Sequence, residues 1–278
     1  MNINNTNEFV LALCRLKGWG PSKVADYVLR HGIDFEQCKE FLKLELTGKE
    51  LIEFSNNLIS VRADLEANNS KHINFIDLFD KRFPRRLYDT NEPVIYLYYV
   101  GDIDLLSSKC ITIIGTRNPD QSFIDSGRTM ADFFSKQHIT IVSGLALGCD
   151  TIAHQSALDS NCPTIAVLPS ALNNVVPAQN RELARNIVKS GGLVISEYSV
   201  LSKMNKFNYP QRDRIQSLLS NVIIIIQSTD DGGTMIAAKK SLKDKKIVYA
   251  LAGNHLELID LYIDPHDKES LTKLMDSI

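Results

Sequence analysis

Short, wholly apolar runs that alternate with amphipathic stretches of helical length dominate the chain from Ile73 onward and constrain its fold most. Runs that are apolar throughout, rather than at every second position, are typical of strands buried on both faces of a sheet. The expected strands are residues 94–100, 111–114, 139–142, 164–168, 193–195, 222–226 and 247–251, and the expected helices are residues 123–136, 149–160, 180–190, 212–219 and 233–243. This alternation predicts an α/β fold with a doubly wound, mostly parallel sheet and right-handed crossovers.

The first 70 residues differ, because they show helical periodicity without strand-like runs. Gly18 ends one expected helix, and Pro21 suits the first turn of the next, in which Val24, Tyr27 and Val28 recur on one face. The pattern is typical of a helix-hairpin-helix. Two interpretations stay open: the hairpin presents helix N-terminal amides to a DNA backbone, or it only packs against the rest of the chain.

The formal net charge of −2 is unevenly distributed along the chain. Residues 71–253 carry more Lys and Arg than Asp and Glu, whereas residues 254–278 are acidic. We therefore expect three parts: a helical domain over residues 1–70, an α/β domain over residues 71–253, and an acidic C-terminal tail, short and helical or loose, over residues 254–278. Basic clusters close to glycine turns in the middle part favour an anionic ligand.

The five cysteines form no CxxC pair and are odd in number, which is typical of reduced thiols in a cytoplasm rather than of a disulfide framework or a zinc site. The N-terminus lacks a basic flank followed by an apolar core, and the longest wholly aliphatic run, residues 222–226, is far too short to span a membrane. We expect a cytoplasmic protein that needs no membrane, no metal and no cofactor.

Two glycine turns follow neighbouring expected strands. In the first, Gly115 and Thr116 allow a tight turn, and Arg117 offers a planar fork for a phosphate. In the second, Ser143 and Gly144 open a helix, so that backbone N–H groups point to the same edge of the sheet. Two such turns in one sheet predict a phosphate-binding crevice.

Two further segments complete this edge of the sheet. Arg212 and Arg214 open an expected helix, where the helix dipole disfavours cations by about 0.3–1 kcal/mol unless an anion is present. Two interpretations stay open: the pair binds an anionic ligand, or both arginines are solvated. Gly233 and Thr234 follow the strand 222–226 and open another helix. His154, one turn into the helix after Ser143, is interpreted as a packing residue because no catalytic partner is predictable for it.

An ordered set of motifs runs through the chain. It comprises Gly18 to Gly20, Ile114-Gly-Thr-Arg117, Ser143-Gly-Leu-Ala146, Asp150 to His154, Val167-Leu-Pro-Ser-Ala-Leu172, Pro177, Asn180-Arg-Glu-Leu183, Ser196-Glu-Tyr198, Tyr209-Pro-Gln-Arg-Asp-Arg214 and Gly233-Thr-Met-Ile236. Over about residues 8–253 the chain resembles the DNA-processing protein A family (DprA, also called Smf) of bacterial single-stranded DNA binders. The resemblance implies a Rossmann-like domain that binds single-stranded DNA by its phosphates without catalysing a reaction, and that loads RecA during DNA uptake and recombination in natural transformation.

On the matching positions, the resemblance implies that the phosphates contact Gly115, Thr116, Arg117, Ser143, Gly144, Arg212, Arg214, Gly233 and Thr234. It also implies RecA and a second copy of the chain as partners. The sequence departs from the family pattern at Leu147, Pro169, Ala171 and Asp213, where the family usually has a basic residue, two glycines and an asparagine.

A second hypothesis concerns free nucleotides. Related Rossmann-like folds act as nucleotide sensors or as phosphoribohydrolases, which cleave a nucleotide's glycosidic bond. Such a hydrolase needs a well-placed carboxylate, and Glu197, Asp230 and Asp231 are the candidates at the sheet edge. A structural adaptor that has kept the fold and lost binding is the third interpretation.

Overall fold

A computed structural model describes residues 5–31 and 35–278, so residues 1–4 and 32–34 of the expected helical domain lie outside the described residues. Four helices come first: α1 (Thr6–Cys14), α2 (Pro21–His31), α3 (Phe35–Glu45) and α4 (Gly48–Asn69). The strands are β1 (Asn74–Asp77), β2 (Tyr96–Gly101), β3 (Cys110–Ile114), β4 (Thr140–Ser143), β5 (Thr164–Val167), β6 (Leu193–Ser196), β7 (Val222–Ile225), β8 (Ile247–Leu251) and β9 (Leu261–Ile263). The later helices are α5 (Arg85–Tyr88), α6 (Gln121–Lys136), α7 (Cys149–Asp159), α8 (Arg181–Lys189), α9 (Asn208–Leu219), α10 (Gly233–Lys243) and α11 (Lys268–Met275), with short 3₁₀ turns at Ile103–Ser107 and Ala178–Asn180.

The expected doubly wound sheet is confirmed. The strands lie in the order β1-β2-β6-β5-β4-β3-β7-β8-β9, and every pairing from β6 to β9 is parallel. From β3 the chain moves outward through β4, β5 and β6, and then returns to the other side of β3 with β7. Strands β1 and β2 extend the β6 edge in antiparallel fashion. The strand order therefore reverses between β3 and β7, where open α/β sheets form their ligand crevice.

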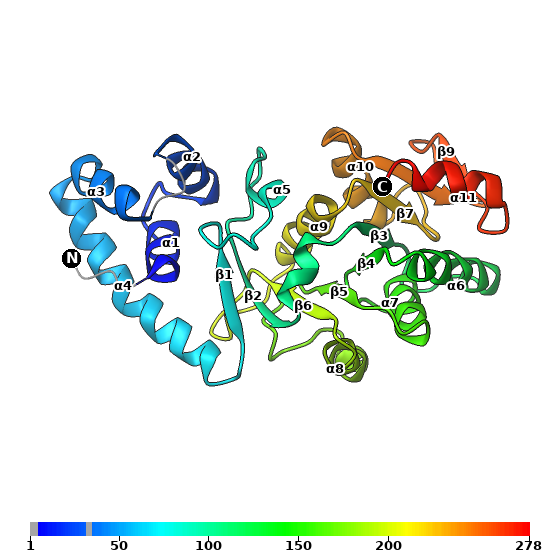
Figure 1. Ribbon diagram of the computed structural model, residues 1–278, viewed down its shortest axis with the longest axis horizontal. Coiled ribbons are helices and arrows are strands. Elements are labelled where there is room, and N and C mark those ends of the chain that lie inside the picture. The colour runs from blue at the N-terminus through cyan, green and yellow to red at the C-terminus, as the bar shows by residue number, and fades with distance from the viewer. Residues whose placement is uncertain (1–4, 32–34) are drawn as a thin grey trace.

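Helices cover both faces of this sheet (Figure 1). Met130, Ala131 and Phe134 of α6 pack with Ala153 and Ala157 of α7 in one apolar cluster. On the opposite face, α9 and α10 pack against the same strands, and they lie on the other side of the sheet from α6, α7 and α8 in the view of Figure 1. Strands covered on both faces are buried throughout, which explains their continuous apolarity.

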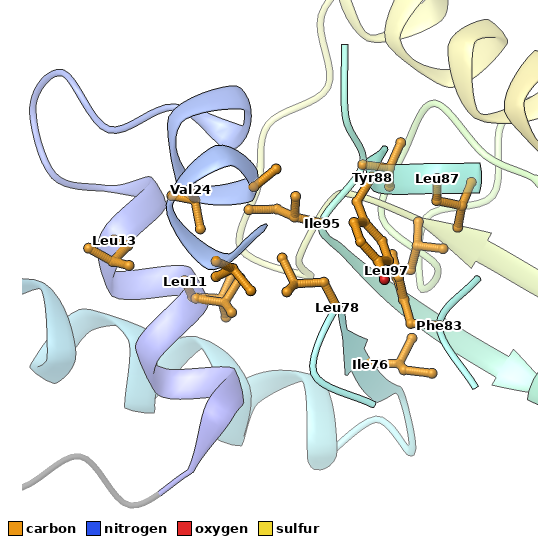
Figure 2. Packing of buried hydrophobic residues seen from close by; sticks show 14 of the residues in the cluster. Leu11, Leu13, Val24, Ile76, Leu78, Phe83, Leu87, Tyr88, Ile95 and Leu97 are labelled. Carbon is orange, nitrogen blue, oxygen red and sulfur yellow. The ribbon is translucent and has the colours of Figure 1, made fainter. Parts of the chain in front are cut away.

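The helical region shares its core with the edge of the sheet. Leu11 of α1 and Val24 of α2 belong to the same buried cluster as Leu78 and Ile95, and Figure 2 shows these side chains facing one another. Pro21 is the first residue of α2, as expected from the sequence. The boundary near residue 70 therefore separates helices from strands without separating two hydrophobic cores.

The segment after residue 253 is more ordered than the loose tail that the sequence analysis allowed. Strand β9 pairs in parallel with β8, with Tyr249 opposite Leu261. In α11, Leu271 and Leu274 are buried in the cluster that contains Phe134 of α6. The sheet thus continues past the expected domain end, because five apolar side chains of the acidic segment are buried in the core: Leu256, Ile259, Ile263, Leu271 and Leu274. None of the helices in the described part of the chain is long and apolar enough to cross a membrane.

Candidate functional site

A cleft of 560 Å³ opens at the carboxyl ends of β3 and β7, where the strand order reverses. The loops after β3 and β7, the start of α7 and the first turns of α9 and α10 form its walls. The lining residues that matter most below are Gly115, Thr116, Arg117, Asp150, Tyr209, Arg212, Asp213, Gly232, Gly233, Thr234 and Ile236. We call this cavity the switch-point cleft.

The turn after β3 is held firmly by its neighbours. The backbone N–H of Thr116 donates to the carbonyl of Gln227 at 2.8 Å, and the N–H of Cys149 donates to the carbonyl of Thr116 at 3.1 Å. A Cβ atom at Gly115 would lie 2.5 Å from the Cys149 sulfur and 3.0 Å from the Gln227 carbonyl oxygen. Only glycine fits there without movement, so Arg117 extends from a rigid support.

Arg117 is exposed, and the central carbon of its guanidinium lies 5.8 Å from the centroid of the Tyr209 ring. Within residues 5–31 and 35–278, no carboxylate forms an ion pair with it. A guanidinium without a carboxylate partner is suited to a phosphate, and the half-buried aromatic ring beside it is suited to a stacked base.

The N-terminus of α10 forms the facing wall. Its N-cap residue is Gly232, and no side chain caps the helix. Gly233 is exposed and Thr234 half-buried, and both line the cleft. The amides of a first helical turn have no intrahelical acceptor, and the helix dipole adds a partial positive charge there. This end of α10 therefore favours an anion.

Arg212 lines the cleft but is largely engaged within the protein. Its side chain is 8% exposed and pairs with Asp213, whose Oδ1 accepts from Nε at 2.8 Å. The same guanidinium donates to the carbonyls of Gly144 and, at 3.2 Å, Val167, and so ties α9 to the ends of β4 and β5. Beside it, burial raises the pKa of Asp150, and the charge of Arg212 opposes that shift.

Arg214 does not line the cleft. Helix α9 begins at Asn208, so Arg214 lies well past its first turn. Its side chain is 6% exposed and donates to both carboxylate oxygens of Glu197, at 2.7 and 2.6 Å, and to the carbonyls of Glu92 and Pro93. The sequence predicted that the charges of both arginines stay unbalanced until an anion binds. This prediction was wrong, because Asp213 and Glu197, together with backbone carbonyls, balance these charges within the protein.

Ser143 also differs from its expected position. It is fully buried, and its hydroxyl donates to the carbonyl of Ile113 at 2.6 Å. The side chain therefore joins β4 to β3 rather than facing a ligand. The reason is that Ser143 is the last residue of β4, a strand covered on both faces, so that its side chain is buried whichever face it points to.

Gly144 lines a smaller pocket of 130 Å³ beside the main cleft, together with Leu147, Pro169 and Pro177. The two cavities share Arg117, Ala146, Tyr209 and Arg212. We call the smaller one the Leu147 pocket. Two of the departures from the family pattern, Leu147 and Pro169, thus lie next to the switch-point cleft rather than within it.

Each candidate catalytic group is bound by another side chain, buried, or located outside the cleft. Glu197 is bound by Arg214, burial raises its pKa, and the arginine opposes that shift. Asp230 and Asp231 are exposed outside the cleft lining. His154 is fully buried, its Nδ1 lies 2.9 Å from the Thr164 hydroxyl, and burial lowers its pKa to about 3. No group of three or more metal-ligating side chains occurs among the described residues.

Sequence reasoning overlooked two apolar surfaces of the cleft. Tyr209 stands beside Arg117, and Ile236, 63% exposed on α10, faces the same cavity. The signal for Tyr209 was its place directly before Pro210, because proline is tolerated in a helix's first turn and marks a helix that starts earlier than residue 212.

Comparison with known proteins gives one consistent result. Residues 74–258 match the family of the DNA recombination-mediator protein A. The protein Smf of Synechocystis is 36% identical over 89% of this chain and 65% of its own length, and the DNA processing protein DprA of Bacillus subtilis is 31% identical over 78% of this chain and 72% of its own. The chain thus spans just under two thirds of the Synechocystis protein.

Two solved structures are similar. DprA from Streptococcus pneumoniae superimposes with a TM-score of 0.72 at 23% identity and covers 99% of this chain and 94% of its own, which shows the shared fold. A structure that describes the single-stranded DNA binding mode of DNA processing protein A from Helicobacter pylori has a TM-score of 0.59 and 30% identity, over 74% of this chain and 88% of its own.

Proposed function

Because the chain belongs to the DNA recombination-mediator protein A family, we propose that it binds single-stranded DNA in the switch-point cleft and catalyses no reaction. The observation that carries the proposal is the guanidinium of Arg117, without a carboxylate partner and beside Tyr209, opposite the uncapped start of α10. The relative from Helicobacter pylori, described in its single-stranded DNA binding mode, supports the same ligand class.

Each wall of the cleft has its own part in this proposal. Arg117 and the amides of Gly233 and Thr234 bind successive phosphates, because cations and helix N-termini are the usual partners of phosphate oxygens. Tyr209 and Ile236 provide apolar surfaces for bases. Since phosphates and ring faces are common to all nucleotides, binding is mostly independent of sequence.

The acidic groups of the cleft are engaged in ways that suit binding better than hydrolysis. Asp213 pairs with Arg212, and Asp150 accepts a hydrogen bond from the backbone N–H of Ala146 at 3.2 Å. Glu197, one of the three carboxylates that the hydrolase hypothesis considered, is bound to Arg214. We therefore prefer a binding function over a nucleotide hydrolase.

Fluorescence anisotropy with a labelled oligothymidylate tests the proposal. Arg117→Ala is expected to weaken binding about tenfold or more, and Tyr209→Ala by about 1–3 kcal/mol, whereas Tyr209→Phe keeps the stacking surface and binds nearly as well as wild type. Arg128→Ala is the matched control, because the Arg128 side chain is 63% exposed on α6, outside the cleft. Tight binding of nucleoside monophosphates without binding of the oligonucleotide would refute the proposal.

We further propose that the bound strand is passed to RecA, that the chain associates with a second copy, and that it works in the cytoplasm during DNA uptake and recombination. The family's description as a recombination mediator supports the first of these, and five free cysteines support a reducing compartment. Stimulation of RecA's DNA-dependent ATPase on protein-coated single strands tests the transfer, and light scattering of the purified chain tests self-association.

A further inference from the structure

A second cleft, of 680 Å³, lies between the helical region and the C-terminal end of α10. The residues that shape its chemistry are Ser22 of α2, Arg86 of α5, and Lys243, Lys245 and Lys246 at the end of α10. Helix α5 lies between the helical region and α9 in Figure 1. We call this cavity the α2–α10 cleft.

Positive charge predominates in the α2–α10 cleft. Two of its acids have their own arginine partners, since Asp26 pairs with Arg30 and Asp89 pairs with Arg85. Asp244 is the remaining acid in the lining. The lining also contains one arginine and three lysines: Arg86, Lys243, Lys245 and Lys246. None of these four cations forms an ion pair with a carboxylate of the described residues. An anion would therefore gain favourable interactions here that the protein does not itself provide.

Arg86 and Lys246 give further reason to expect an anion in the α2–α10 cleft, because they lie close together and are only partly exposed to solvent. The guanidinium of Arg86 donates to the carbonyls of Leu106, at 2.6 Å, and Ser108, and its buried Nε has no hydrogen-bond partner in the described structure. Burial and the neighbouring Arg86 charge lower the pKa of Lys246, and the charge of Asp244 opposes that shift. Two half-buried like charges repel each other, and a phosphate between them would relieve the repulsion.

The α2–α10 cleft is connected to the switch-point cleft along α10. The N-terminal end of this helix lines the first cleft and its C-terminal end lines the second, and its 11 residues span about 16 Å. Lys240 and Lys243 follow Ile236 at helical spacing on one face. A strand that leaves the switch-point cleft along this face would meet Lys240, which pairs with Glu92, and then Lys243, which forms no ion pair among the described residues.

We propose that the α2–α10 cleft is a second phosphate site, which binds the backbone of single-stranded DNA beyond the switch-point cleft. This inference rests on the proposed function, since it assigns a longer path to the same ligand. It also gives the helical region a direct part in binding, because Ser22 and Ala25 of α2 lie in the lining.

Oligothymidylates of two lengths test the inference. One of about six nucleotides fills the switch-point cleft, and one of about twenty reaches both sites. We expect K245Q/K246Q to weaken binding of the long oligonucleotide about five- to tenfold and to leave the short one unchanged. The salt slope for the long oligonucleotide should become shallower by about 1.4, which corresponds to two phosphate contacts. K268Q/K273Q, on α11, is the matched control and should change neither oligonucleotide.

The outcomes separate the two proposals. If the wild-type chain binds neither oligonucleotide, the proposed function fails. If it binds both and K245Q/K246Q binds the long one as tightly as wild type, only the second site is refuted. A calorimetric titration with inorganic phosphate tests whether the α2–α10 cleft binds a free anion instead. Suppose that K245Q/K246Q abolishes saturable phosphate binding and leaves binding of the long oligonucleotide unchanged. The ligand of this cleft would then be a small phosphate compound and not a DNA strand.

Discussion

Arg117, Arg212 and Arg214 carry the same charge in three different environments. The first is exposed without a carboxylate partner, the second shares its charge with Asp213 and two carbonyls, and the third is buried against Glu197. A phosphate gains most from the guanidinium that the protein has not already neutralised. At the scale of single residues, Arg117 is thus the main cation of the switch-point cleft, and the other two arginines hold the walls in place.

The pair of Glu197 and Arg214 gives the first prediction. Glu197→Gln leaves a buried guanidinium without its counter-charge, so we expect the free energy of unfolding to fall by about 3 kcal/mol. Urea denaturation followed by circular dichroism measures the change. Glu182→Gln breaks an exposed pair with Arg185 and should cost at most about 0.5 kcal/mol. Equal effects of the two substitutions would contradict a buried, structural role for Glu197.

At the scale of elements, the start of α10 lacks a side-chain cap and is also part of the proposed binding surface. Gly232 has φ −67° and ψ 150°, an extended conformation open to any residue, yet no side chain caps the helix. Asp, Asn or Ser at an N-cap normally stabilises a helix. An uncapped end leaves its amides available to a ligand, at some cost in stability.

Substitution of Gly232 tests whether the free amides at the start of α10 bind a phosphate. Gly232→Asp places a carboxylate at the amides proposed for phosphate and is expected to weaken binding of single-stranded DNA at least tenfold. Gly232→Asn offers the same cap without the charge and meets the same near contact, 3.0 Å from its Cβ to the Thr229 carbonyl. The charged variant should therefore bind more weakly than the neutral one although both have similar melting temperatures. Equal affinities would argue against a phosphate at α10.

The pattern of apolar runs was sufficient to predict the central parallel strands and the helices between them, because burial on both faces leaves a continuous signal. It could not reveal β9, whose Leu261 and Tyr262 are partly exposed. The sequence predicted that α9 begins at residue 212, whereas it begins at Asn208, because Pro210 lies in its first turn. Likewise, spacing predicted which loops meet at the sheet edge, but not that Ser143 and Arg214 face inward, since side-chain direction depends on the tertiary partners.

At the scale of the whole molecule, the helical region and the edge of the sheet share one hydrophobic core. Their shared cluster joins α1 and α2 to the strand edge (Figure 2). In addition, Asp64 of α4 is buried and accepts a hydrogen bond from the hydroxyl of Ser199, beyond β6. Removing either part would expose the apolar surface of the other. The helical region therefore supports the loop that leads to α9 as well as its own helices.

This continuity predicts cooperative unfolding. The chain has one tryptophan, Trp19, which is 3% exposed in the helical region. Urea unfolding monitored by Trp19 fluorescence should coincide with unfolding monitored by far-ultraviolet circular dichroism, which reports on the helices of both regions. An earlier fluorescence transition would show instead that the helices unfold independently of the sheet.

The most direct test of the central claim is the salt dependence of single-stranded DNA binding by wild type and Arg117→Ala. Each neutralised phosphate contributes about −0.7 to the slope of log affinity against log salt concentration. We predict a steep slope for wild type, and for Arg117→Ala a weaker affinity with a slope shallower by about 0.7 or more. A wild-type slope near zero, or an unchanged slope in the variant, would contradict a phosphate-binding cleft centred on Arg117.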